Sequence, residues 1–148
     1  MPRLCTIGYE QASLDQVIGA LKEAGVAVVV DVRAVAASRR PGFSKTILGA
    51  SLKAEGVDYV HLRALGTPKA GREAARAGRT QEMHAIFEAH LEEPEAVLAL
   101  AEAARIVQDR PAALLCYEAD AARCHRRILS DRLSEDLGLA VVDLNITF

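Results

Sequence analysis

The sequence predicts an α/β fold with three layers, in which a mostly parallel, doubly wound sheet of about five strands has helices on both faces. Short β-branched and apolar runs alternate with stretches of about 10–15 residues that carry apolar side chains at helical spacing. Residues 27–32 are apolar on both faces apart from Asp31, which is typical of a strand inside a parallel sheet. A length of 148 residues suits one core, so a single domain is expected over residues 1–148.

Five apolar runs predict the strands, and periodic apolar positions predict the helices between them. The expected strands are residues 3–8, 27–32, 57–62, 112–117 and 139–144, in the spatial order 3-2-1-4-5. The expected helices are residues 14–24, 45–55, 80–91, 94–104 and 121–137, the first three with Ser13, Ser44 and Thr80 as N-caps. In the fourth helix, the residues expected to face the core are Val97, Leu98, Ala101 and Ala104. Residues 64–79 are rich in glycine and are expected to be irregular.

Charge is distributed unevenly along the chain, although the formal net charge at pH 7 is only −2. Residues 32–81 carry a local charge of +7 and the remaining residues carry −9, which indicates an anionic partner for the middle of the chain. No apolar stretch approaches the roughly 20 residues that span a bilayer, so no membrane partner is expected, and the N-terminus lacks the apolar segment of a signal peptide. Three irregularly spaced cysteines favour a reduced, cytoplasmic protein without a disulfide framework.

Residues suited to chemistry or to anion binding follow several of the predicted strands. In open parallel sheets ligands bind beyond the carboxyl ends of the strands, so these residues are expected to converge on one edge. The candidates for catalysis are Asp31, Cys116, Glu118 and His125, and the candidates for anion binding are Gly8, Arg33, Arg40 and Arg126.

Two interpretations are open for several of these candidates. Glu118 is either a general base or hydrogen-bond acceptor, or the cap of the following helix. Asp31 either binds a ligand or forms an internal pair with Arg33, because a carboxylate in an apolar strand needs a partner. Arg40, on a loop fixed by Pro41, either clamps a phosphate group or stays solvated.

The cysteines near the fourth strand allow three interpretations. Cys116 and Cys124 are packing residues, or one of them is a nucleophile whose pKa is lowered by Arg126 and by the start of the predicted helix. Together with His125 and His61 they would also supply two sulfur and two nitrogen ligands to zinc. The spacing Cys-x7-Cys-His matches no standard zinc pattern, so neither a metal nor another cofactor is expected.

Several motifs of the chain are similar to those of one known family. They are Thr6–Tyr9, Val30–Arg33 with Ser38–Ser44, Tyr59–Leu62 with Leu65-Gly66, and Cys116–Glu118 with Cys124–Arg126. On these motifs the chain resembles the family called domain of unknown function 488, from Thr6 to about Leu144. The resemblance implies an α/β domain with its site at the residues chosen above, and it implies no particular reaction. The chain differs from many relatives at Tyr9-Glu10, Ala36 and Thr67.

These features favour an enzyme or binding domain that acts on a phosphorylated ligand, a nucleotide or a nucleic acid. The candidate arginines would hold the anion, and Glu118 with Asp31 or His125 would transfer protons. The first alternative is cysteine-thiol chemistry of a sulfurtransferase-like or phosphatase-like kind. The second is a non-catalytic interaction domain, in which acidic helices within residues 80–105 contact a partner. The apolar stripe Met83–Leu91 leaves room for a homodimer.

Overall fold

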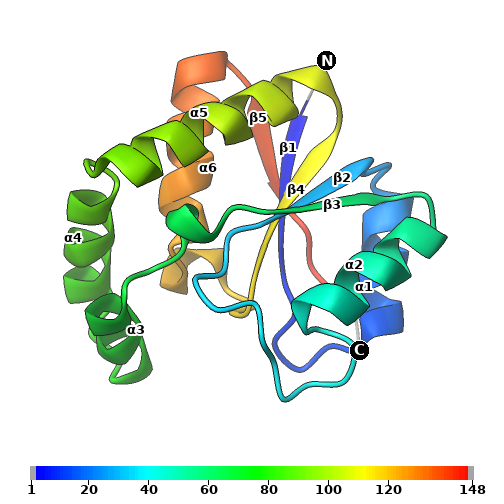
Figure 1. Cartoon of the computed structure of the whole chain (residues 1–148), viewed down its shortest axis with the longest axis horizontal. Coiled ribbons are helices and arrows are strands. Elements are labelled where there is room, and N and C mark those ends of the chain that lie inside the picture. The colour runs from blue at the N-terminus through cyan, green and yellow to red at the C-terminus, as the bar shows by residue number, and fades with distance from the viewer. Residues whose placement is uncertain (1–2, 147–148) are drawn as a thin grey trace.

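The computed structural model describes residues 3–146, whose five strands form one parallel sheet with helices on both faces (Figure 1). The strands are β1 (Arg3–Gly8), β2 (Val28–Asp31), β3 (Asp58–His61), β4 (Ala112–Cys116) and β5 (Ala140–Asp143). The helices are α1 (Leu14–Glu23), α2 (Lys45–Ala54), α3 (Lys69–Arg76), α4 (Thr80–His90), α5 (Pro94–Asp109) and α6 (Arg126–Leu137). Two 3-10 helices, η1 (Arg63–Leu65) and η2 (Ala121–Arg123), precede α3 and α6. The predicted three-layer α/β fold is confirmed.

The strands lie in the order β3-β2-β4-β1-β5, so the expected order 3-2-1-4-5 is wrong. All residues of β4 are buried, whereas most residues of the edge strands β3 and β5 are half-buried. A strand of alanines and leucines that is apolar on both faces suits the centre of a parallel sheet. In this register Cys116 pairs with Gly8 of β1, and Leu115 pairs with Asp31 of β2. The carboxyl ends of β1, β2 and β4 therefore meet at one edge.

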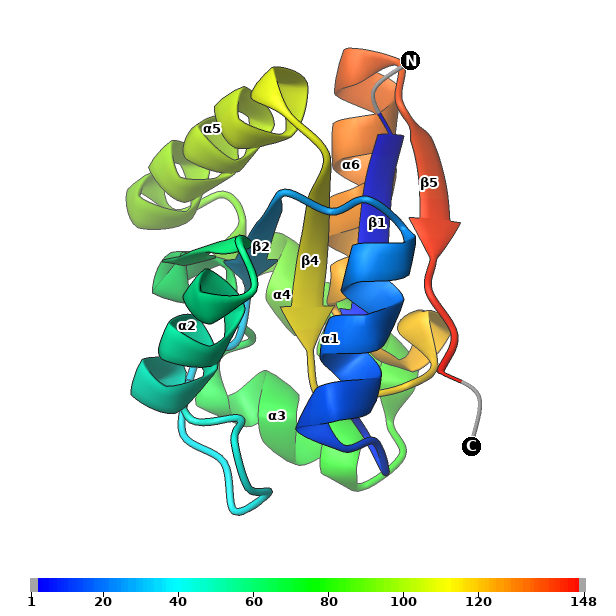
Figure 2. The ribbon, with the colours of Figure 1, turned by 90° about the vertical axis from the view of Figure 1, so that its right-hand side faces the viewer.

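Two hydrophobic cores lie on the two faces of the sheet. One packs α1 and α2 against the strands, through side chains such as Leu21 and Leu48. The other packs α4, α5 and α6, through Phe87, Val107 and Leu129. Figure 2 shows α1 in front of the sheet and α6 behind it. The chain leaves β1 and β2 toward one face and leaves β4 toward the other, which opens room for a ligand between the connections.

The first helix begins as its sequence predicts, and the second differs in one detail. The backbone N–H of Gln16 donates to Ser13 Oγ at 3.1 Å, and the N–H of Ser13 donates to the Gln16 side chain at 2.8 Å, which is the predicted capping box. Ser44 occupies the N-cap position of α2, but its hydroxyl forms hydrogen bonds with the backbone of Ser38 instead of the first turn. Ser44 thereby ties the loop after β2 to the start of α2.

The prediction that residues 64–79 are irregular is wrong, because the segment contains η1 and the eight-residue helix α3. α3 packs on α4, and its buried residues are Gly71 and Ala74. Since the packing face consists of the smallest side chains, apolar periodicity gives no sign of a helix. The consequence for the site is that Arg72 and Arg76 stand at a fixed place beside the strand ends.

The inward face of α5 also differs from the prediction. Val97 and Leu98 are 50% and 72% exposed, Ala101 is exposed, and Ala104 is half-buried. The residues that face the core are Ala96, Ala103, Ile106 and Val107. Apolar residues occur nearly all round this helix, so its periodicity fits more than one face.

Two predicted helix starts are displaced. Arg79 takes the N-cap position of α4, and Thr80 is the first helical residue. Residues 121–137 form two helices, because Cys124 has an extended backbone (φ −123°, ψ 148°) that ends η2, and α6 begins at Arg126. The break at Cys124 decides where the thiol points, so it matters for the site.

Two expectations about partners concern surfaces of the fold. Within residues 3–146, no helix is long and apolar enough to cross a membrane. In the stripe expected to leave room for a homodimer, Met83, Phe87 and Leu91 are all buried inside the chain. The homodimer itself stays a prediction.

Candidate functional site

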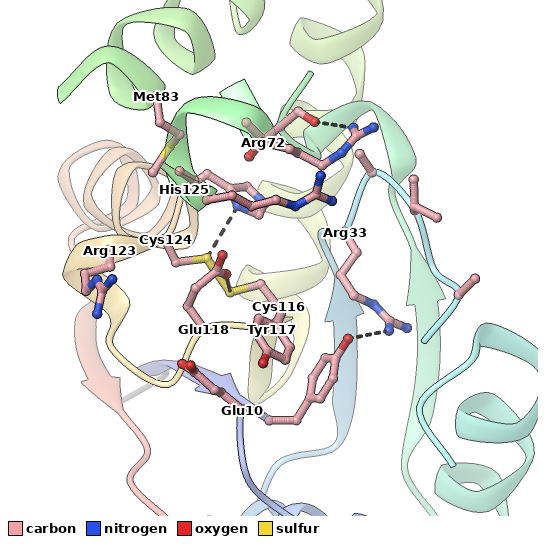
Figure 3. A pocket seen from close by; sticks show the side chains of 17 residues that line it. Glu10, Arg33, Arg72, Met83, Cys116, Tyr117, Glu118, Arg123, Cys124 and His125 are labelled. Atoms are coloured by element: carbon pink, nitrogen blue, oxygen red, sulfur yellow. Dashed lines mark hydrogen bonds between the residues drawn. A yellow bond between two sulfur atoms is a disulfide. The ribbon is translucent and has the colours of Figure 1, made fainter. Parts of the chain in front are cut away.

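A pocket of about 580 Å³ lies at the carboxyl edge of the sheet, where β1, β2 and β4 end (Figure 3). Its walls come from the loops after these three strands, from α3 and the turn before it, and from the first turn of α4. The charged side chains that line it are Glu10, Arg33, Arg72, Arg76, Glu118 and Arg123. The volume is that of an ordinary small-molecule site, for which about 300–1,000 Å³ is usual.

Cys116 and Cys124 lie side by side in the wall of this pocket (Figure 3). Cys116 ends β4, Cys124 follows η2, and both are only 1% exposed. They are joined as a disulfide, with their Cα atoms 7.6 Å apart. The sequence favoured reduced cysteines; in this structure the break at Cys124 brings its sulfur to that of Cys116 at the end of β4. Cys5 of β1 is free and buried, and burial raises the pKa of its thiol.

Arg126 holds the loop after β4 and contacts the sulfur of Cys116. Its Nη1 donates to Cys116 Sγ at 2.9 Å and to the backbone oxygen of Glu118, and its Nη2 donates to Ala119 O at 3.1 Å. The side chain is completely buried, and burial lowers the pKa of Arg126. A guanidinium beside a sulfur stabilises the thiolate when the cysteine is reduced.

Glu118 points toward the two cysteines from the loop after β4 (Figure 3). Its Oε2 lies 3.6 Å from Cys116 Sγ. Burial raises the pKa of Glu118, and this effect outweighs the positive charge of Arg126. The alternative role as a helix cap belongs to another residue, because Asp120 Oδ1 accepts the N–H of Ala122 at the start of η2. Glu118 is thus placed to exchange a proton with a pocket ligand.

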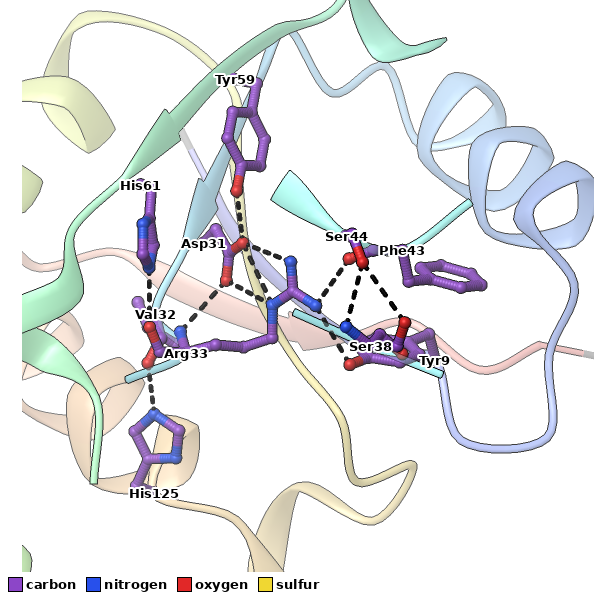
Figure 4. Close-up of polar contacts among 10 residues, drawn as sticks. All are labelled: Tyr9, Asp31, Val32, Arg33, Ser38, Phe43, Ser44, Tyr59, His61 and His125. Carbon is purple, nitrogen blue, oxygen red and sulfur yellow. Dashed lines mark hydrogen bonds and ion pairs between the residues drawn. The ribbon is translucent and has the colours of Figure 1, made fainter. Parts of the chain in front are cut away.

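Two histidines fix the backbone at the end of β2 (Figure 4). His125 Nε2 donates to Val32 O at 2.7 Å, and His61 Nε2 donates to Arg33 O at the same distance. Both nitrogens are donors because a carbonyl oxygen only accepts. Burial lowers the pKa of His125 to about 4, so the ring is neutral at physiological pH. Its Nδ1, which carries the lone pair, lies 3.4 Å from Cys124 Sγ.

Asp31 and Arg33 form the internal pair that the sequence offered as one of two interpretations (Figure 4). Arg33 Nε and Nη2 donate to the Asp31 carboxylate at 2.7–3.1 Å, and Tyr59 Oη donates to it at 2.5 Å. Arg33 Nη1 also donates to Phe43 O and to Tyr9 Oη. Burial alone would lower the pKa of Arg33, but the bonds and charge of Asp31 raise it. Asp31 is fully buried.

The other candidates for anion binding also contact protein groups. Arg40 Nη2 donates to Ala12 O at 2.5 Å and lies outside the pocket. Gly8 lies directly under the loop after β4, where an added Cβ would be 1.7 Å from Glu118 O. Of the four candidates, Arg33 lines the pocket, whereas Gly8, Arg40 and Arg126 stand behind or beside it.

Arginines that the sequence analysis did not select line the pocket instead. Arg72 and Arg76 come from α3, and Arg123 comes from η2. Arg72 Nη1 donates to Thr67 O at 2.9 Å, and among the described residues no hydrogen bond or ion pair engages the guanidinium groups of Arg76 and Arg123. Arg72 and Arg76 contribute to the local charge of +7 over residues 32–81. The sequence analysis could not assign this charge to the site because it did not predict α3.

The fold and the site together define a parallel α/β protein with a cysteine-containing pocket at the carboxyl edge of its sheet. The chain belongs to the family described as domain of unknown function DUF488, which matches residues 13–133. The match includes both the Asp31–Arg33 segment and the segment from Cys116 to Arg126, and it confirms the resemblance found in the motifs. No curated protein and no solved structure matches the chain significantly.

Proposed function

We propose that the pocket binds an anionic, phosphorylated small molecule, such as a nucleotide, and that the protein is an enzyme or binding domain acting on it. The observation that carries the proposal is the group of three arginines, Arg72, Arg76 and Arg123, around one pocket. Guanidinium groups bind phosphate with paired hydrogen bonds as well as charge. These arginines outnumber the two glutamates of the lining, and the fourth arginine is neutralised by Asp31.

A small ligand suits the pocket better than a nucleic-acid strand. The arginines gather in one concave site of about 580 Å³ instead of following an extended groove. Tyr117 is 45% exposed in the lining, and its ring offers a face on which a base can stack. The whole chain contains three Tyr, three Phe and no Trp, too few aromatic rings for a strand-binding surface built on base stacking.

Binding is tested by thermal shift and titration calorimetry with inorganic phosphate, pyrophosphate and a nucleoside monophosphate as probes. At least one probe is expected to raise the melting temperature, because a ligand that binds only the folded state stabilises it. Arg72→Ala and Arg123→Ala are each expected to weaken that binding by about tenfold or more, since a hydrogen bond to a charged group contributes about 1.5–3 kcal/mol.

The matched control is Arg105→Ala on α5. Arg105 is an exposed arginine that lies outside the pocket, with only a 3.9 Å contact to Glu102. This variant is expected to bind the probe as the original chain does. The proposal is wrong if no phosphate-containing probe stabilises the protein, or if Arg105→Ala weakens binding as much as the pocket variants.

Thiol chemistry is the second candidate function, and the surroundings of Cys116 favour it. A buried guanidinium donates to its sulfur, and the carboxyl group of Glu118 lies 3.6 Å away. After reduction of the disulfide, the sulfur of Cys116 is therefore set up as a nucleophile that faces the ligand pocket.

Alkylation of the reduced protein near pH 7 tests this second candidate, with the modified peptides identified by mass spectrometry. We expect Cys116 or Cys124 to react with iodoacetamide at least about tenfold faster than Cys5, which lies outside the pocket, has a raised pKa and serves as an internal control. Equally slow labelling of all three cysteines would remove the case for a nucleophilic thiol.

A further inference from the structure

Three donor atoms of the types that bind thiophilic metal ions converge beside the pocket, and a fourth, from His125, lies next to one of them (Figure 3). The Sγ atoms of Cys116 and Cys124 and a carboxylate oxygen of Glu118 lie within 4.8 Å of one another. Glu118 Oε2 is 3.6 Å from Cys116 Sγ, and His125 Nδ1 is 3.4 Å from Cys124 Sγ. Donors that bind one zinc ion tetrahedrally at about 2.0–2.3 Å lie about 3.5 Å apart, so both spacings suit a shared ion.

The tautomer of His125 fits this role. Its Nε2 carries the hydrogen that is donated to Val32 O, so the lone pair of Nδ1 faces Cys124 Sγ. When the cysteines are reduced and ionised, a lone pair and a thiolate would face each other, and a cation between them removes that repulsion. A histidine that donates its second ring nitrogen to a backbone carbonyl is the usual arrangement around a bound metal.

The surroundings of the cysteines support the same interpretation. The Cα atoms of Cys116 and Cys124 are 7.6 Å apart, wider than the 4.4–6.8 Å that disulfides usually span. This wide spacing leaves room for the two sulfur atoms, once reduced, to separate around a shared ion. Arg126 donates to Cys116 Sγ, and its positive charge offsets part of the negative charge that two thiolates and Glu118 bring together.

We propose that, in the reduced protein, Cys116, Glu118, Cys124 and His125 form a binding site for zinc or a similar thiophilic divalent ion. Reduction by a dithiol breaks the S–S bond, and the two electrons and two protons that the dithiol supplies leave two thiols and an oxidised dithiol. The ion then binds as the two thiol protons leave to solvent. This proposal does not rest on the proposed anion binding, since none of the pocket arginines is a ligand, although the four residues line the same pocket.

The structure changes one ligand relative to the set considered from the sequence. His61, the distant nitrogen of that set, donates to Arg33 O. Glu118, two residues from Cys116, replaces His61 in the set of ligands. The spacing then reads Cys-x-Glu-x5-Cys-His, which places all four ligands within residues 116–125, from the end of β4 to the residue before α6.

Metal analysis of the protein kept in a phosphine reductant tests the proposal. After incubation with Zn²⁺ and gel filtration, the original chain is expected to retain about one equivalent of zinc. Co²⁺ in place of zinc is expected to give the sulfur-to-cobalt charge-transfer band of a thiolate site. Cys116→Ser and Cys124→Ser are expected to lose both signals, and Glu118→Gln is expected to weaken zinc binding by about tenfold or more.

Cys5→Ala is the matched control, because Cys5 is a buried cysteine of β1 that lies outside the cluster, and it is expected to keep the zinc. Circular dichroism of each metal-free variant shows whether it is folded, and Glu118→Gln serves where a cysteine variant does not fold. The site is rejected if the reduced original chain retains no zinc, or if a folded Cys116→Ser or Cys124→Ser variant retains as much as Cys5→Ala. Zinc binding without phosphate binding rejects the proposed function alone, and the reverse result rejects the metal site alone.

Discussion

Asp31→Ala is expected to lower the free energy of unfolding by about 3–5 kcal/mol, because it leaves a buried charge without its partner. The Asp31 carboxylate accepts four hydrogen bonds from the guanidinium and the backbone N–H of Arg33, at 2.7–3.1 Å. Arg33 is only 6% exposed, so water cannot replace these bonds. Tyr59 loses its acceptor in the same variant. Urea denaturation monitored by circular dichroism measures the effect.

The control for this variant is Asp58→Ala at the start of β3. Asp58 also pairs with an arginine, Arg110, at 2.7 Å, but its side chain is 59% exposed. An exposed ion pair contributes about 0–1 kcal/mol, so the control is expected to lose little stability. Equal losses for the two variants would contradict the role of burial at Asp31.

Gly8→Ala is expected to cost about 3 kcal/mol or more, although it adds a single methyl group. The new Cβ would lie 1.7 Å from the backbone oxygen of Glu118 and 2.9 Å from Nη1 of Arg126. The backbone of the loop after β4 must therefore move, and the bond from the buried guanidinium of Arg126 to Glu118 O must break. Denaturation measures the stability, and the probes and metal ions named above measure the loss of the site in any folded fraction.

Gly19→Ala in α1 is the matched control, because the added methyl group meets nothing within 4 Å. Alanine is preferred over glycine inside a helix by about 0.5–1 kcal/mol, so this variant is expected to be slightly more stable than the original chain. If Gly8→Ala were as stable as Gly19→Ala, the close contact between β1 and the loop after β4 would have no energetic importance.

The fold class could be predicted from the sequence because each strand and most helices carry a local pattern. Ser13 with Gln16 marks the start of α1, and the apolar run before Asp31 marks β2. Strand order has no such local pattern, because it depends on which strands pair with each other across the sheet. α3 was missed for a related reason: its packing face is Gly71 and Ala74, which no hydrophobic period reveals.

Part of the candidate site could also be predicted. Cys116, Glu118 and His125 were selected because they follow a buried strand at the edge where ligands bind, and the structure brings them together. An arginine has five donors and binds backbone carbonyls as readily as anions. Whether Arg126 faces a ligand or Glu118 O depends on the path of a loop, which the sequence does not specify.

The placement of α3 and α4 divides the lining of the pocket between two units of the fold. These two helices pack on each other beside the sheet, and α3 contributes Arg72 and Arg76 to the pocket (Figure 1). Cys116, Glu118 and His125 come from a different unit, the connection between β4 and α6. Two of the three pocket arginines therefore belong to one unit, whereas Arg123 belongs with the cysteines to the other. If the proposed function holds, substitutions in residues 69–76 are expected to change which anion binds without displacing the cysteine cluster.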